Sequence, residues 1–576
     1  MLQFFQRMRL PLVVLISAYA IATVGFTLMP GLDDEGNPWR LSLFEAFYVV
    51  SYTGSTIGFG EVPYEFSAAQ RMWTMVSIYL TVFAWLFSIG SIISLLQDPA
   101  FRRTMQRARF RRAVRAMDRP FYLVCGYGDT GRLLTRSLTR QHYPLVVMDN
   151  NADKIDALAV QQYSAPVNAF CMDARLPDNL IEAGLQSRWC MGVLAVTRDS
   201  QANLKIAISG KLLNRRCSVH ARADLPGVAD NMRSFETDHV VNPIEEYVKR
   251  MRLAFEQPQA FRLYHWLQSG PDARVPDVRQ PPRGRWILCG FGALGQAAFE
   301  MLTEVGMEVT VIEEDTRIPG LPSGSIRGRG TQAETLKEAN IDDAVGILAT
   351  TDDDVDNLSI VMTAREINEQ LFFGVLENGL SSHALFRAAK PDFIGQPSTV
   401  IAGAILSRIR SPLVHEFMEQ LIAEPEEVAA DLLERLQSWQ QPDPPDLFTL
   451  RISQRRAPAL AGLLDRGIEV PLNALTRDPA HPDQGLPIAP LLLCREGTNR
   501  LLPDPTTRLA TGDRLLLAAR AGMGLRLTRL LENENALART ITGRDIHQGW
   551  LWQRLFPQNL QAVQNGKLNT EAQRKT

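Results

Sequence analysis

The stretch SYTGSTIGFGEVPYEF, Ser51–Phe66, combines a loop composition with surroundings that resemble a membrane segment. It is rich in Gly, Ser and Thr, which favour turns and accessible backbone. No Lys, Arg, Asp or Glu occurs in the segments 10–32 and 72–97 that lie on either side of it. Such a loop has three interpretations: a simple turn, a phosphate-binding loop, or a place where backbone carbonyls face an ion.

Both uncharged segments are long enough to cross a membrane, because about 20 helical residues span a hydrocarbon core of roughly 30 Å. The rest of the 576-residue chain contains no comparable segment. Arg7, Arg9 and the triplet Ala18-Tyr19-Ala20 would also fit a cleavable signal peptide. The apolar run continues to Leu28, which is longer than a typical signal-peptide core, and this favours a retained helix. The sequence therefore predicts a small membrane domain and a large soluble part.

Charged residues are distributed unevenly around the two predicted spans. A cluster of arginines runs from Arg102 to Arg119, whereas the connection between the spans carries Asp33, Asp34 and Glu35. The positive-inside rule predicts a multi-pass protein of the inner (plasma) membrane with both termini in the cytoplasm. The six cysteines show no metal-binding spacing and are expected to be reduced thiols. The formal net charge of -2 indicates no polyanionic partner, so we expect no nucleic acid. Lipid contact is expected from the two apolar spans.

The segment 40–54, RLSLFEAFYVVSYTG, has apolar residues at helical spacing but is too short to span the membrane. We expect a re-entrant helix followed by irregular backbone. Irregular backbone at membrane depth is tolerated only where protein buries it or where it lines a water-filled path. The loop therefore favours the third interpretation, in which successive carbonyls face an ion.

Residues 53–60, TGSTIGFG, match the signature T-x-x-T-x-G-x-G at every fixed position, and the segment resembles the selectivity filter of potassium channels. The resemblance implies that five consecutive residues coordinate K⁺: Thr56, Ile57, Gly58, Phe59 and Gly60. It also implies that Thr56 supplies the innermost ligands. Phe59 replaces the Tyr of most members, and Glu61 stands where an Asp commonly follows.

A single filter loop cannot surround an ion, so four copies must assemble around an axis as a homotetramer. In that assembly the acidic residues of the connection, together with Glu61, would surround the outer mouth and raise the local cation concentration. Gly90 in the second span is a candidate gating hinge, because glycine permits helix bending. Close helix packing is an equally good explanation of Gly90.

The soluble part contains an internal repeat. FYLVCGYGDTGRLLTRSL from Phe121 and RWILCGFGALGQAAFEML from Arg285 each combine a strand pattern, G-x-G-x-x-G and a helix pattern. An acid, Asp149 or Glu313, ends the next predicted strand, 23 residues after the first glycine of each motif (149 minus 126; 313 minus 290). A second shared motif, G-x-L-A-x-T-x-D-x-x-x-N-L, begins at Gly192 and Gly346. Two Rossmann-like dinucleotide-binding units in tandem are predicted.

Each glycine turn would let phosphate oxygens approach N–H groups at a helix N-terminus, and each acid would bind ribose hydroxyls. The predicted ligand is NAD(H) or an adenine nucleotide of the ADP/ATP type. The predicted binding residues are Gly126, Gly128, Asp129, Thr130, Gly131, Arg132, Asp149 and Asp173 in the first unit, and Gly290, Gly292, Gly295 and Glu313 in the second. The alternative is an empty fold whose glycines serve packing alone, and this alternative is stronger for the second unit because its loop is less polar.

A filter joined to these units resembles bacterial two-helix potassium channels with tandem RCK (regulator of potassium conductance, also KTN or TrkA-N) domains. The implied fold is an α-helical pore domain with two transmembrane helices, a re-entrant pore helix and a filter, followed by two α/β Rossmann-like RCK domains and a small α+β C-terminal lobe. The implied boundaries are 1–98 for the pore domain, 99–119 for a basic linker, 120–243 for the first RCK N-lobe, 244–284 for crossover helices, 285–400 for the second N-lobe, 401–441 for further crossover helices, 442–533 for the C-lobe and 534–576 for a tail. The crossover helices, around 248–267 and 413–436, would pair subunits.

Some relatives bind Ca²⁺ through acids after the fourth strand and within the fifth, but this chain holds Thr197 and SVHARAD at the corresponding places. Asp352 and Asp354 are a weak alternative pair of oxygen ligands, and a solvated acidic loop explains them better. The leading functional prediction is a potassium channel gated by nucleotide, and not an enzyme. The rivals are a membrane-anchored NAD-dependent oxidoreductase, which lacks an evident acid–base constellation, and a regulatory subunit of a potassium transporter.

Overall fold

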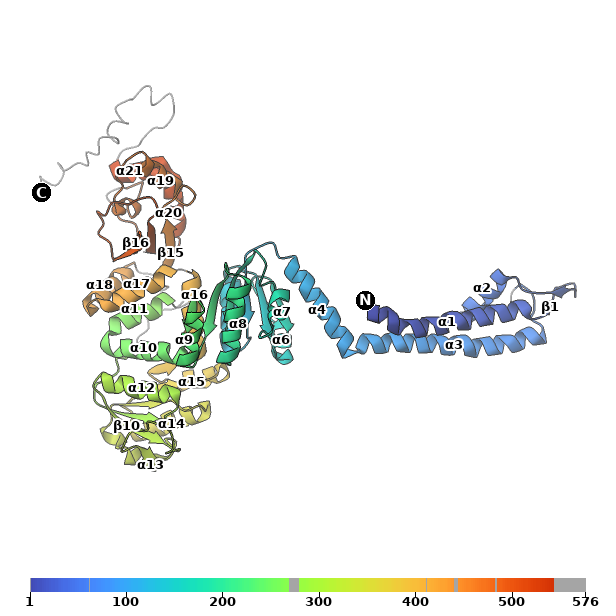
Figure 1. The fold of residues 1–576 in the computed structure, drawn as a ribbon, viewed down its shortest axis with the longest axis horizontal. Helices are drawn as coiled ribbons and strands as arrows, with labels where there is room; N and C mark the ends of the chain where they lie inside the picture. The colour runs from blue at the N-terminus through green and yellow to red at the C-terminus, as the bar shows by residue number, and fades with distance from the viewer. Residues whose placement is uncertain are drawn as a thin grey trace, which may run out of the picture. The chain divides into compact units, whose positions relative to one another are not determined.

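The computed structural model describes residues 2–61, 63–268, 279–410, 412–439, 444–481 and 484–542. The chain forms two compact units, Met1–Ala116 and Met117–Thr576, and we describe each by itself (Figure 1). Most of the predicted tail, from 543 to 576, and residues 269–278 of the segment 244–284, which was predicted to form crossover helices and a linker, lie outside the described residues.

The first unit consists of two long helices, two shorter helices and a small hairpin. Its elements are α1 (Leu2–Leu28), β1 (Gly31–Leu32), β2 (Pro38–Trp39), α2 (Leu43–Gly54), α3 (Ala68–Gln97) and α4 (Pro99–Arg115). Helices α1 and α3 lie side by side (Figure 1). Their segments Arg9–Leu28 and Ala68–Ser94 are long and apolar enough to cross a membrane. Phe26, Val50 and Phe66 form part of a buried cluster in which α2 packs between the two long helices.

Local sequence signals explain where α2 and α4 begin. Ser42 accepts a hydrogen bond from the backbone N–H of Glu45, whose carboxylate accepts one from the N–H of Ser42; this reciprocal pair is a capping box. Asp98 caps α4 by accepting a hydrogen bond from the N–H of Ala100, and Pro99 occupies the first turn, where no N–H is needed. The basic linker is therefore helical, and only one residue separates it from α3.

The first Rossmann-like sheet is parallel, in the order β5-β4-β3-β6-β7-β8. Its strands are β3 (Phe121–Cys125), β4 (Leu145–Asp149), β5 (Val167–Cys171), β6 (Cys190–Ala195), β7 (Ser218–Arg222) and β8 (His239–Val241), and its helices are α5 (Asp129–Arg140), α6 (Ala152–Ala159), α7 (Pro177–Glu182), α8 (Ser200–Leu213) and α9 (Pro226–Ser234). The strand order reverses direction between β3 and β6, which creates a crevice at the carboxyl ends of the strands.

The second sheet repeats this order as β11-β10-β9-β12-β13-β14, which confirms the predicted duplication. Its strands are β9 (Arg285–Cys289), β10 (Glu308–Glu313), β11 (Ile326–Arg327), β12 (Gly346–Ala349), β13 (Phe372–Leu376) and β14 (Phe393–Gly395), and its helices are α12 (Ala293–Glu304), α13 (Ala333–Glu338), η1 (Ile341–Asp343), α14 (Asp354–Ile367), η2 (Leu380–Ser382) and α15 (His383–Ala389).

The two Rossmann-like units exchange helices. Helix α10 (Pro243–Glu256) follows the first sheet but packs on α12 of the second unit, and α16 (Pro397–Arg410) follows the second sheet but packs on α5 of the first. Ile401 and Ile405 are fully buried in the core of the first unit. Phe255 contacts Trp286 edge to face in the core of the second, with ring centroids 5.4 Å apart. This pairing lies within one chain. The expected pairing of subunits through the segments around 248–267 and 413–436 stays a prediction.

The remaining helices and the C-terminal lobe share two cores. The elements are α11 (Pro258–Gln268), α17 (Pro412–Ala423), α18 (Glu426–Gln437), β15 (Asp446–Arg451), α19 (Pro458–Asp465), η3 (Leu472–Leu475), β16 (Ile488–Arg495), β17 (Thr498–Leu501), β18 (Arg514–Ala519), α20 (Met523–Glu532) and α21 (Glu534–Thr542). The sheet is antiparallel, in the order β15-β18-β16-β17. Residues 534–542, which were assigned to the tail, form α21, and Leu537 is buried in the C-lobe core.

Candidate functional site

The segment after α2 has an alternating backbone. Thr56, Gly58 and Gly60 have φ of 62°, 67° and 93°, whereas neither Ile57 nor Phe59 has a positive φ. Glycine adopts the left-handed region without a steric penalty, which explains its place at two of these three positions. A backbone that alternates between left-handed and right-handed conformations turns successive carbonyls toward the same side. This is the geometry that an ion-coordinating row of oxygens requires.

Side chains of the membrane unit hold the C-terminal end of this segment. The Tyr52 hydroxyl donates a 2.6 Å hydrogen bond to the carbonyl of Gly60. Glu61 accepts two hydrogen bonds from the guanidinium of Arg71, at 2.9 and 3.0 Å, and one from the N–H of Phe66. Asp33 accepts hydrogen bonds from the N–H groups of two residues of its own turn. Two of the acids predicted at the outer mouth therefore also fix their loops.

The predicted filter and hinge positions are open in a single chain. Ile57 and Phe59 are 62% and 61% exposed, although both are large and apolar. Among the residues that the structure describes, a Cβ added at Gly90 would meet no atom within 4 Å. Helix α3 continues unbroken through it. The roles of these residues remain predictions.

A cavity of about 390 Å³ lies at the carboxyl ends of the strands of the first Rossmann-like unit. Most of the predicted binding residues of this unit line it, namely Gly126, Gly128, Asp129, Thr130, Arg132, Asp149 and Asp173. Gly131 does not line it. A Cβ at Gly131 would lie 2.0 Å from the carbonyl oxygen of Gly126, so the third glycine permits the helix to approach the turn.

The acid at the end of β4 already has protein partners. Asp149 accepts hydrogen bonds from the N–H groups of Tyr127, at 2.7 Å, and Asn151, at 2.9 Å, and Lys154 lies 3.7 Å away. It therefore braces the glycine turn as well as facing the cavity. Nearby, Arg175 pairs with Asp173 at 2.8 Å, and this hydrogen bonding holds the pKa of Asp173 below its usual value.

The second unit has a smaller cavity of about 260 Å³, which Gly290, Gly292 and Glu313 line. Gly295 does not line it. A Cβ there would lie 2.1 Å from the carbonyl oxygen of Gly290, so this glycine also permits the helix to approach the turn. Glu313 accepts a 2.6 Å hydrogen bond from the N–H of Phe291, which repeats the bracing by Asp149. The geometry of the two glycine turns is therefore the same.

The two cavities differ in charge. The first is lined by five basic residues, Arg132, Lys154, Arg175, Arg198 and Arg222, and by four acids, Asp129, Asp149, Asp173 and Asp199. The second is lined by one basic residue, Arg329, and by four acids, Glu313, Glu314, Asp352 and Asp356. Arg329 is itself paired with Glu314 at 2.8 Å. Positive charge favours phosphate groups, so the first cavity suits a nucleotide better than the second.

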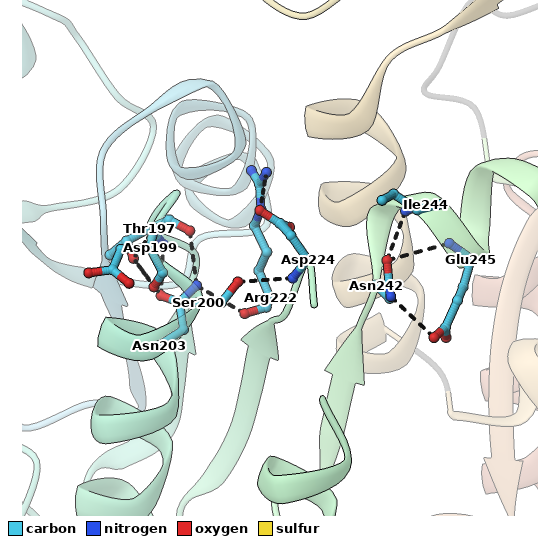
Figure 2. A network of polar contacts seen from close by, with 9 residues as sticks. All are labelled: Thr197, Asp199, Ser200, Asn203, Arg222, Asp224, Asn242, Ile244 and Glu245. Carbon is cyan, nitrogen blue, oxygen red and sulfur yellow. Dashed lines mark hydrogen bonds and ion pairs between the residues drawn. The ribbon is translucent and has the colours of Figure 1, made fainter. Parts of the chain in front are cut away.

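The second shared motif forms a pin between neighbouring strands. The Asn203 amide donates to the carbonyls of Thr197 and Arg222 and accepts from the N–H of Thr197 (Figure 2). Asn357 makes the same contacts with Thr351 and Leu376 in the second unit. Each Asn thereby joins the carboxyl ends of two adjacent strands beside the cavity.

Asp199 and Asp353 cap the helices that follow these pins. Asp354 accepts hydrogen bonds from the N–H groups of Asn378 and Gly379. The carboxylate therefore has backbone partners in the same unit.

Several lining residues of the first cavity were missed from the sequence. Lys154 and Arg175 follow β4 and β5, and Arg222 is the last residue of β7, so their position at the carboxyl ends of parallel strands could have indicated them. Ser398 also lines the cavity, although it belongs to α16 of the second unit. No local pattern could have revealed Ser398, because it reaches the cavity through the helix exchange.

Comparison with known proteins assigns families to both parts of the chain. The ion channel family model matches residues 13–98. The TrkA-N domain model matches twice, at residues 122–243 and 286–388. Together the matches cover more than half of the chain, and the two TrkA-N matches include the first sheet and all but the last strand of the second.

Curated relatives include potassium channel protein 1 of Methanocaldococcus jannaschii, 24% identical over 42% of this chain and 67% of the relative. Probable potassium channel protein 2 of the same organism is 20% identical over 41% of this chain and 65% of the relative. The alignments thus span about two thirds of these channels. Among solved structures, the GsuK channel bound to NAD is 16% identical, with a TM-score of 0.45 over 91% of this chain and 97% of that one.

The family assignment rests on the matched sequence domains, since the structural superposition is loose. An ion channel domain with two apolar helices is followed by two TrkA-N domains on parallel sheets of identical order. The chain therefore belongs to the potassium channels that join a two-helix pore domain to tandem RCK (TrkA-N) domains.

Proposed function

We propose that four copies of this chain form a potassium-selective channel of the inner membrane, gated by a nucleotide in the first TrkA-N cavity. The observation that carries the proposal is the alternating backbone of Thr56–Gly60, with positive φ at every second residue. Such a row of carbonyls can replace the hydration shell of K⁺ when several copies surround it. The exposed side chains of Ile57 and Phe59 provide apolar surface for neighbouring copies.

The basic character of the first cavity supports a nucleotide as the regulatory ligand. Its glycine turn leads directly into α5, whose N-terminal N–H groups can bind phosphate oxygens. The GsuK channel has been solved with NAD and with ADP, and we propose the same classes of ligand here. Asp149 disfavours the 2′-phosphate of NADP, so NAD(H) and ADP or ATP are the candidates.

The linker provides a route from the cavity to the pore. Helix α3 ends at Gln97, α4 runs from Pro99 to Arg115, and the first strand of the TrkA-N unit begins at Phe121. Few residues separate these elements, so a change in the TrkA-N domains can pull on α3. A ligand would shift the channel only by the difference in its affinity for the open and closed states.

Flux through liposomes that contain the purified full-length protein tests the proposal. We expect K⁺ flux to exceed Na⁺ flux, and we expect NAD⁺, NADH or ADP to change the K⁺ flux. Gly58→Ala is the control for the pore, because a side chain at φ 67° strains the filter backbone. Equal K⁺ and Na⁺ flux would contradict the pore assignment, and K⁺-selective flux that ignores every nucleotide would contradict the ligand assignment.

A further inference from the structure

The first cavity is built by both TrkA-N units. Ser398, in the first turn of α16, lines it and is only 8% exposed. In the described part of the chain, no hydrogen-bond partner is assigned to its hydroxyl. Helix α16 is held in this place by Ile401 and Ile405, which are buried against α5 of the first unit. The position of Ser398 is therefore fixed by packing and not by a polar partner.

A second hydroxyl in the cavity lacks a partner. Thr130, in the first turn of α5, is 3% exposed and lines the same cavity. Its Oγ1 is buried without a hydrogen-bond partner among the described residues. A buried hydroxyl without a partner is destabilising, and an acceptor on a bound ligand removes that penalty. Two residues with a hydroxyl group, each in the first turn of a helix, thus line one cavity.

The corresponding helix start in the first unit has no such free group. The repeat aligns Asn242 and Ile244 with Gln396 and Ser398, 154 residues later (396 minus 242). Asn242 accepts hydrogen bonds from the N–H groups of Ile244 and Glu245, which closes the start of α10 (Figure 2). Ile244 carries no hydroxyl and is not among the lining residues of the second cavity. The serine contribution therefore belongs to the first cavity alone.

We propose that Thr130 and Ser398 donate hydrogen bonds to one phosphate group of a nucleotide in the first cavity, so that the ligand ties the two TrkA-N units together. The chemistry is that of a phosphate oxygen shared by two hydroxyls and two helix N-termini. This inference rests on the proposed nucleotide site. Through Ser398, the second unit would contact the nucleotide that is bound in the first.

Calorimetric titration of the full-length channel with ADP and with adenosine tests the contact. Ser398→Ala should weaken ADP binding about 10-fold, as expected for loss of one hydrogen bond to a charged group. Adenosine binding should change less than about twofold, because adenosine has no phosphate. Ser398→Thr keeps the hydroxyl and should retain most of the ADP affinity. Thr130→Val should resemble Ser398→Ala.

Thr399→Ala is the matched control, because Thr399 is exposed, bonds to Gln396 and does not line the cavity. ADP affinity of Ser398→Ala within twofold of the unmodified channel would overturn the inference and leave the proposed function intact. An equal loss of ADP and adenosine affinity would also overturn it, since that pattern indicates a general distortion. A parent channel that binds neither ADP nor NAD⁺ would overturn both proposals.

Discussion

The two TrkA-N units of this chain share a scaffold and differ in chemistry. Each has the same strand order, the same asparagine pin and the same acid bracing a glycine turn. Yet basic residues outnumber acids in the first cavity, whereas acids outnumber the one arginine in the second. The G-x-G-x-x-G fingerprint therefore indicates the backbone fold, whereas the charged residues that line the cavity indicate which ligand can bind.

The third glycine of each G-x-G-x-x-G motif, where the helix packs against the glycine turn, gives the sharpest test of whether only the first cavity binds nucleotide. Gly131→Ala and Gly295→Ala each place a methyl group about 2 Å from a carbonyl oxygen, so each should destabilise its unit by roughly 3–4 kcal/mol. Thermal unfolding of the full-length protein should show both losses. ADP titration should show that only Gly131→Ala removes binding, and binding lost in Gly295→Ala alone would reverse the assignment of the two cavities.

The asparagine pins should matter equally in both units. Asn203 and Asn357 are fully buried and each satisfies several backbone groups, so replacement by Ala leaves those groups without partners. We expect a loss of about 3 kcal/mol for either variant. Hydrogen exchange at β7 and β13 measures it locally. A large effect in one unit only would mean that the pin was kept for its ligand and not for the fold.

Acid should affect the first unit more than the second. Burial, with Arg408 nearby, lowers the pKa of His239 from 6.5 to about 4, and the second unit has Phe393 at the corresponding position. The unfolded chain binds a proton near pH 6.5 that the folded chain takes up only near pH 4. Stability is therefore full above pH 6.5 and falls as the pH drops toward 4, by about 2 kcal/mol after allowance for partial exposure.

Hydrogen exchange at β8 and β14 between pH 7 and pH 4.5 checks this dependence. We expect exchange, corrected for its intrinsic pH dependence, to accelerate at β8 and not at β14. His239→Phe should reduce the acceleration at β8, and the rest is expected from His220, whose pKa burial lowers to about 3. Equal acid sensitivity of both strands in the unmodified protein would show that other groups control it.

Neutralising the bracing acids should have the smallest effect. Asp149→Asn keeps an oxygen for the Tyr127 N–H but removes charge beside Lys154, and Glu313→Gln is the matched change in the second unit. We expect roughly tenfold weaker NADH binding for Asp149→Asn and less than twofold weaker binding for Glu313→Gln. Fluorescence titration with NADH provides the measurement. Similar losses in both variants would place ligand in both cavities.

Much of this organisation could be predicted because it depends on local pattern. The two charge-free segments, the alternating glycines of the filter and the repeated fingerprint each identify an element within about thirty residues. The parallel order and the cavity position follow from the β-α alternation. The chain-spanning features could not be predicted this way. Ser398 lines the first cavity only because α16 crosses to α5.

The helix α21 illustrates the same limit. Its short sequence has an amphipathic pattern, but only its packing, with Leu537 in the C-lobe core, shows that it belongs to the lobe. The bracing role of Asp149 was also hidden, because the fingerprint points to a ribose and not to the N–H of Tyr127. In each case the missing information was a contact between distant residues.

The exchange of α10 and α16 has a consequence for how the chain is made. Leu134 and Leu138 of the first unit are covered by Ile401 and Ile405, which the ribosome adds more than 260 residues later (401 minus 134). During synthesis the apolar face of α5 in the first unit stays uncovered until α16 has left the ribosome. Nascent chains of this protein should therefore depend on chaperones over that interval, and neither repeat can be deleted without uncovering the other.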